Sequence, residues 1–256
     1  MIPLSDDNPR NGTFPFVTVA LIGICIAVFL YQIGLPAEYQ QAFTYFYGAV
    51  PAEIMGRLPG QHTDNGYATG GYLSILTSMF MHGGVAHIAG NMLYLWIFGD
   101  NVEIAMGKIR YLIFYLLTGT IAALTHAYFD PTSQIPMVGA SGAISGVLGA
   151  YLMLFPKANV KMLLILGFFW RLIHVPAFLV LGLWFLFQFF GIAAVRPGEG
   201  GVAVLAHVGG FIAGMILVHL FIRKDEHLFH SQKSKPWEMQ KAAIANLRKP
   251  RPWDGQ

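Results

Sequence analysis

Residues 139–150 read GASGAISGVLGA, an uncharged stretch that is rich in glycine and alanine. On a helix its small residues fall on two adjacent faces: Gly142, Gly146 and Ala150 on one, and Ser141, Ser145 and Gly149 on the other. Small residues at every fourth position let helix backbones approach closely in lipid. The stretch therefore predicts a closely packed helix. The same pattern recurs downstream in Ala206, Gly210 and Gly214.

The composition of the whole chain indicates a membrane environment for this helix. The 256 residues are 55% hydrophobic and only 11% charged, with a mean hydropathy of +0.54. Soluble domains carry about 25% charged residues, so a water-soluble monomer, a disordered chain and a nucleic-acid-binding module are excluded. The single cysteine, Cys25, allows no intramolecular disulfide, and the sequence has no Cys/His cluster with zinc-site spacing. The chain is predicted to be a polytopic membrane protein.

Six segments are apolar enough to be predicted as membrane-spanning helices, since a span takes about 20 mostly apolar residues. They are Phe14–Ile33, Val85–Gly99, Tyr111–Phe129, Gly139–Phe155, Val175–Val195 and Gly201–Ile222. The first is interpreted as a retained helix, because no cleavage site of the signal-peptide type follows it. Asp100 is expected to mark the end of the second. The predicted fold class is all-α, with six transmembrane helices.

The positive charges predict how these helices are oriented. Of the 16 Lys and Arg residues, only Arg57 and Arg196 fall in the loops of one side. Cytoplasmic loops are enriched in Lys and Arg, so both termini are expected to be cytoplasmic. The predicted organisation is a cytoplasmic N-terminus (1–13), a membrane domain (14–222) and a basic cytoplasmic tail (223–256). The basic tail is explained by topology rather than by nucleic-acid binding.

The sequence also makes predictions about three further segments. Residues 35–80 form a long loop on the outer side, and a loop of this length usually has structure or function. Residues 156–174 form a cytoplasmic loop, apolar in its middle and flanked by charges, which is expected to lie at the membrane interface. The aromatic run Trp184–Phe190 in the fifth segment is expected to face lipid.

Polar side chains from three segments are predicted to meet at one depth. A helical rise of 1.5 Å per residue places Ser141, His207 and His87 each roughly 8–10 Å below the outer face of the membrane. Asn91 lies one turn below His87 on the same helix face. Polar and ionisable groups inside a membrane are costly and usually functional. The convergence therefore indicates a site.

A serine beside a histidine is the minimum for nucleophilic catalysis. The imidazole can take the hydroxyl proton and later give it to the leaving amine. Because Ser141 opens a helix, backbone N–H groups near Gly139–Ser141 can point at a developing oxyanion. His87 and Asn91 could add side-chain donors. Ser145, one turn deeper, is the alternative nucleophile, although it lacks the preceding Gly-x.

These residues lie in three motifs that together resemble those of the rhomboid family of intramembrane serine proteases. Gly139–Gly142 is similar to the family's GxSG, His82–Asn91 to its HxxxxHxxxN and Ala206–Gly210 to its AHxxG. The motifs stand in the family's order, on the second, fourth and sixth predicted helices. The resemblance covers about residues 14–222 and implies a compact six-helix bundle.

The resemblance also implies a role for each matched residue. Ser141 would be the nucleophile and His207 the general base of a Ser-His dyad. His87 and Asn91 would stabilise the oxyanion together with the Ser141 backbone N–H. His82 matches an outer histidine that is taken to be structural.

Two departures from the family pattern bear on the site. Leu73-Ser74 stand where some relatives carry Trp-Arg in the outer loop. Ser145 stands where some relatives have a tyrosine stacked on the catalytic imidazole. The sequence therefore leaves open which group orients His207.

The predicted function is that of an intramembrane serine endopeptidase that cuts membrane-anchored proteins near the outer end of a transmembrane helix. No metal or organic cofactor is expected. The expected partners are transmembrane protein substrates and the lipid bilayer, without nucleic acid, and the oligomeric state stays open. A non-catalytic relative and a histidine-based proton transporter are the alternatives. The short N-terminus favours a bacterial plasma (inner) membrane over an organellar one.

Overall fold

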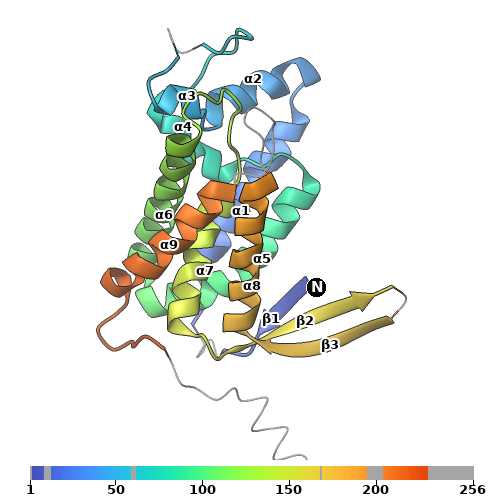
Figure 1. Ribbon diagram of the computed structural model, residues 1–256, viewed down its shortest axis with the longest axis vertical. Helices are drawn as coiled ribbons and strands as arrows, with labels where there is room; N and C mark the ends of the chain where they lie inside the picture. Colours follow the sequence, from blue (N-terminus) through green and yellow to red (C-terminus); the bar gives the residue numbers. More distant parts are fainter. Residues whose placement is uncertain (1, 9–12, 59–61, 168, 195–203, 230–256) are drawn as a thin grey trace, which may run out of the picture.

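The computed structural model describes residues 2–8, 13–58, 62–167, 169–194 and 204–229. Each of the six predicted segments contains a helix, and the helices pack into one bundle (Figure 1). They are α1 (Phe16–Gly34), α5 (Val85–Met106), α6 (Lys108–Phe129), α7 (Ser141–Leu154), α8 (Ala177–Ala194) and α9 (Val204–Phe221). The predicted ends at Val195 and Gly201, and most of the basic tail, lie outside the described residues.

Length and composition distinguish these helices. Within the described ranges, α1, α6 and α9 are long and apolar enough to cross a membrane, while α7 and the Ala177–Gln188 part of α8 are shorter apolar helices. The mostly helical, multi-pass character of the protein is confirmed. Membrane crossing by all six helices stays a prediction.

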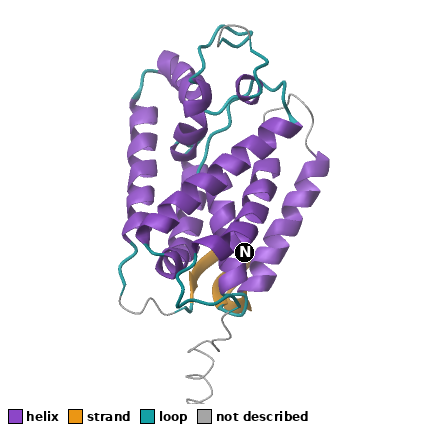
Figure 2. Ribbon diagram, turned by 90° about the vertical axis from the view of Figure 1, so that its left-hand side faces the viewer, coloured by secondary structure: helices purple, strands orange, loops and turns teal. Residues whose placement is uncertain are grey.

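The all-α prediction is wrong at one end of the bundle, where a three-stranded antiparallel sheet is formed (Figure 2). Its strands are β1 (Ile2–Asp6), β2 (Asn159–Leu166) and β3 (Phe169–Pro176), in the order β1-β2-β3. The segment expected to be an interfacial loop is thus a hairpin, with Gly167 at φ +59° in its turn. Pairing of Ile2 with Leu163 adds the N-terminal segment to the hairpin as an edge strand. We call this end of the bundle the sheet end.

The second helix continues past its predicted end. Asp100 lies inside α5 and is fully buried, and the helix runs to Met106, followed by Gly107, whose φ of +82° suits glycine. The Glu103 carboxylate accepts the backbone N–H groups of Val17 (2.9 Å) and Thr18 (2.7 Å) and the Thr18 hydroxyl (2.8 Å). A carboxylate at a helix N-terminus satisfies orphan donors and the helix dipole. Glu103 is therefore part of the packed α1–α5 contact, and the buried Asp100 does not mark a surface boundary.

The predicted outer loop contains several short helices and covers the end of the bundle opposite the sheet (Figure 1). An antiparallel bridge between Ala49 and Met137 ties it to the segment that precedes α7. Its short helices are α2 (Ala37–Tyr47), α3 (Pro51–Ile54), η2 (Gly71–Leu73), α4 (Ser74–Thr77) and η3 (Ser78–Phe80). The loop thus helps to hold the beginning of α7.

Glycines set the distance between α7 and α9. A methyl group at Gly210 would collide with the Gly142 carbonyl, and one at Gly214 would collide with the Gly146 carbonyl. The two backbones are therefore in direct contact, which confirms the close packing predicted from the small-residue pattern. This contact brings the first turns of α7 and α9 together, so that their polar residues can meet.

Candidate active site

Ser141 is the first residue of α7, directly after the buried Ala140. The chain reaches it through Gly139, whose φ of +131° is open to glycine and strained for other residues. The Gly139 N–H donates to the Ser78 carbonyl (2.9 Å), which anchors this turn to η3. The first N–H groups of a helix have no partner within it. The Ser141 hydroxyl therefore lies beside backbone donors at a helix N-terminus.

His207 lies in α9 and is 8% exposed. Its Nε2 atom is 2.8 Å from the Ser141 Oγ atom. Its Nδ1 atom is 2.9 Å from the Gln188 Oε1 atom of α8, and its ring lies 5.9 Å from the Trp184 ring. The structure thus brings together the two residues predicted to meet, and it places α8 on the far side of the imidazole.

His87 lies against the turn that precedes Ser141. A Cβ atom at Gly139 would be 2.8 Å from His87 Nε2, so the imidazole occupies the space that a side chain at Gly139 would need. The Gly83 N–H donates to His87 Nδ1 over a long 3.4 Å. Because Nδ1 accepts, Nε2 is the nitrogen that carries the proton. His87 therefore presents an N–H donor toward the Gly139–Ser141 turn.

Asn91, one turn along α5, is also buried. Among the described residues, its Nδ2 atom has no hydrogen-bond partner. A buried unpaired donor costs about 1–3 kcal/mol. Buried unpaired donors of this kind are found where a group is positioned to bind a ligand or a reacting atom.

The other two polar residues of the motifs have structural contacts. The Ser145 hydroxyl donates to the Ser141 carbonyl (2.6 Å) and is almost fully buried, so it is engaged by its own helix. The His82 ring is buried and contacts the His87 ring edge-on, with centroids 5.2 Å apart. These contacts leave Ser141 as the serine whose hydroxyl faces a histidine.

The expectation that the whole run Trp184–Phe190 faces lipid is wrong for two residues. Trp184 and Gln188 face His207, whereas Leu186, Phe187 and Phe190 are 52%, 65% and 71% exposed. Trp184 and Gln188 are one helical turn apart and so share a face. The available signal was the single amide in an otherwise aromatic and aliphatic helix, because polar groups in such helices are usually functional.

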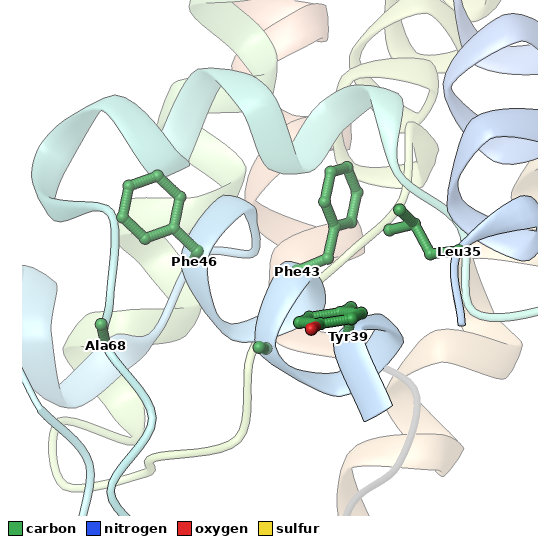
Figure 3. Close-up of a pocket in the computed structure, with 6 residues that line it drawn as sticks. Leu35, Tyr39, Phe43, Phe46 and Ala68 are labelled. Carbon is green, nitrogen blue, oxygen red and sulfur yellow. The ribbon is translucent and has the colours of Figure 1, made fainter. Parts of the chain in front are cut away.

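An apolar pocket of about 380 Å³ lies elsewhere, along α2 (Figure 3). It is lined by Leu35, Tyr39, Ala42, Phe43, Phe46 and Ala68. Neither Ser141 nor His207 lines it, and it offers no acid, base or nucleophile besides a phenol. Within the described ranges there is also no group of three His, Cys, Asp or Glu side chains that could hold a metal ion.

A protein-family model for the rhomboid domain matches residues 69–224, which is more than half of the chain. The chain therefore belongs to the rhomboid family. It is a multi-pass membrane protein of a family of intramembrane serine proteases.

Individual relatives agree with this assignment. The chain is 35% identical to the rhomboid protease GluP of Bacillus subtilis over 149 residues, which is 57% of this chain and 25% of the relative. It is 28% identical to the rhomboid protease AarA of Providencia stuartii over 226 residues, 80% and 72% of the two chains. It is also 28% identical to inactive rhomboid protein 1 of Drosophila melanogaster over 142 residues, 56% of this chain and 9% of that one. The chain thus spans only a quarter of GluP, and the family includes a member that is named as inactive.

Proposed function

We propose that this protein is an intramembrane serine endopeptidase with a Ser141–His207 dyad. The observation that carries the proposal is the 2.8 Å distance between Ser141 Oγ and His207 Nε2 at the start of a helix. Relatives named as rhomboid proteases support the same activity. The inactive Drosophila relative defines the alternative that a cleavage assay must exclude.

The geometry supports a two-step acyl transfer. The Ser141 oxygen attacks the scissile carbonyl carbon while its proton passes to His207 Nε2. The tetrahedral intermediate collapses as His207 returns this proton to the leaving amine, which yields an acyl-enzyme. A water molecule, deprotonated by His207, then releases the second product and restores the Ser141 hydroxyl. The residues of this chain supply each proton transfer, without a metal or organic cofactor.

The developing oxyanion would be met by donors from two elements. The Ser141 backbone N–H lies at the α7 N-terminus, where the helix dipole favours negative charge. His87 Nε2 abuts Gly139, and the Asn91 amide is buried without a partner among the described residues. We assign both side chains to oxyanion stabilisation.

The proposed substrates are membrane-anchored proteins, cut near the outer end of a transmembrane helix. A helix hides its scissile carbonyls in hydrogen bonds, so small residues, glycine or proline near the cut would favour cleavage.

We further propose a bacterial plasma membrane with both termini cytoplasmic. Because the native Cys25 is fully buried, single cysteines added to the tail or at Asp64 can report this orientation. The tail should react only from the cytoplasmic side, and a tail reached from outside in intact cells would overturn the orientation.

The activity is tested by cleavage of a single-span model substrate in proteoliposomes. Ser141→Ala and His207→Ala should each reduce cleavage by at least about 10³-fold, as expected for members of a catalytic dyad. Ser145→Ala, the matched control, should keep substantial activity. Chelators should have no effect. Cleavage by Ser141→Ala at the wild-type rate would refute the proposal, and no cleavage by folded wild-type protein would favour the non-catalytic alternative.

A further inference from the structure

The helix that faces the back of His207 contributes one polar side chain, Gln188. Its Oε1 atom lies 2.9 Å from His207 Nδ1, on the opposite edge of the ring from Ser141. The Gln188 Nε2 atom donates to the Trp184 carbonyl one turn back in the same helix (3.4 Å). These two contacts fix which amide atom faces which group. The nitrogen bonds to its own helix, and the oxygen faces the imidazole.

This arrangement selects one tautomer of His207. A carbonyl oxygen can only accept hydrogen bonds, so His207 Nδ1 must be the nitrogen that carries the proton. Nε2 then has a free lone pair directed at the Ser141 hydroxyl. This is the form that a general base needs, and the opposite tautomer would present an N–H to the serine.

The Trp184 ring adds a second constraint from the same helix face. Its centroid lies 5.9 Å from that of His207, with the planes inclined by 38°. Trp184 and Gln188 therefore act on the imidazole together, one on its ring and one on its Nδ1 edge. Ser145, bonded to the Ser141 carbonyl, makes no such contact.

We propose that Gln188 is a positioning residue that fixes the orientation and tautomer of His207, with Trp184 as its packing support. The proposal rests on the proposed function of the Ser141–His207 pair. It assigns α8 a part in the catalytic machinery, where a Ser-His dyad with a neutral amide replaces the acidic third member of a triad.

The test measures turnover per active site, titrated with a fluorophosphonate, together with its pH dependence. Gln188→Leu keeps the size of the side chain and removes the acceptor. We expect it to lower turnover on the order of tenfold to a hundredfold, less than the about 10⁴-fold loss seen when a charged orienting residue is neutralised, with little change in KM. Phe187→Leu on the exposed face of α8 is the matched control and should stay within twofold of wild type.

Gln188→Glu provides a readout that a packing role cannot produce. A glutamate keeps the acceptor, so activity should be restored relative to Gln188→Leu at alkaline pH. Its negative charge favours the imidazolium form, so the acidic limb of the pH–rate profile should shift to higher pH. The titratable groups that act electrostatically on His207 are His87 of α5 and His126 of α6, and both are unchanged in this variant.

The outcomes separate this proposal from the one on which it rests. If Ser141→Ala is inactive but Gln188→Leu turns over within twofold of wild type, only the positioning role fails. It fails too if Gln188→Glu leaves the acidic limb in place, a result that can be obtained even if the leucine variant does not fold. If Ser141→Ala still cleaves normally, the dyad itself is wrong.

Discussion

The buried Glu103 carboxylate at the sheet end and the buried Asn91 amide near Ser141 differ in how fully they are hydrogen-bonded. At the sheet end, the Glu103 carboxylate takes three hydrogen bonds from the start of α1. Near Ser141, the buried Asn91 amide nitrogen has no partner within the described part of the chain. A saturated polar network holds elements together, whereas an unsaturated donor is costly and persists where a ligand or transition state completes it. The comparison predicts opposite effects of mutation at the two ends.

The largest effect on stability is expected for Glu103→Ala. It leaves two backbone N–H groups and the Thr18 hydroxyl without their acceptor in a buried place. Loss of charge-assisted bonds of this kind should lower the free energy of unfolding by about 3 kcal/mol or more, and a loss of this size should lower Tm by roughly 6–12 °C. Thermal unfolding in detergent measures the change.

Two controls sharpen this result. Glu38→Ala removes an exposed carboxylate from α2 and should change Tm little. Turnover per titrated active site should stay near wild type in Glu103→Ala, since the cap lies at the other end of the bundle. If Glu103→Ala leaves Tm unchanged, the Glu103 hydrogen bonds do not stabilise the fold, and the contrast with Asn91 fails.

Asn91→Ala should behave in the opposite way. We expect Tm to change by no more than about 2 °C, because the amide nitrogen has no bond to lose and an unpaired buried donor is itself destabilising. Turnover per active site should fall about tenfold, less than the 10²–10³-fold loss of a principal oxyanion donor, because backbone N–H groups share the charge.

The oxyanion role can also be tested at His87, alone and in combination with Asn91. His87→Ala should also lower turnover per active site, and the double variant should be worse than either single change. If Asn91→Ala and His87→Ala instead lose stability while each labelled Ser141 turns over normally, the two residues only pack α5 against α7.

The smallest expected effect concerns Asp6 of β1. Burial raises its pKa from 3.8 to about 7, with nearby Asp100 and Asp7 adding to the rise and the Tyr151 hydrogen bond opposing it. The folded state therefore holds a proton that the unfolded state has released between about pH 4 and pH 7, so this group makes stability fall as pH rises through that window. Asp6→Asn should flatten this slope and be relatively more stable at pH 8. Unfolding curves at pH 5 and pH 8 measure it, and an unchanged slope would contradict the assignment.

Apolar length was enough to predict the six helices, and depth along them was enough to predict that Ser141 and His207 meet. Both depend on local spacing and on the cost of polar groups in lipid. The sheet could not be predicted in this way, because β1 and β2 are separated by most of the chain and β1 has no partner in its own neighbourhood. Only the tertiary fold brings Ile2 opposite Leu163.

The remaining differences have a common physical cause. Asp100 is predicted to mark the end of the second helix because charged residues are usually exposed, yet it lies inside α5 and the packed fold buries it completely. The aromatic run does not show the role of Gln188, because the side of α8 that faces the site depends on how α8 docks on α9. In both cases the tertiary packing around a polar residue determines its role, and the local sequence does not show this packing.

Covalent labelling of the folded, detergent-solubilised protein with a fluorophosphonate tests the central claim most directly. The Ser141–His207 geometry predicts one adduct per chain, mapped by mass spectrometry to Ser141, and labelling at least about 100-fold slower in His207→Ala. An adduct on Ser145, or labelling of Ser141 that is independent of His207, would contradict the proposed dyad.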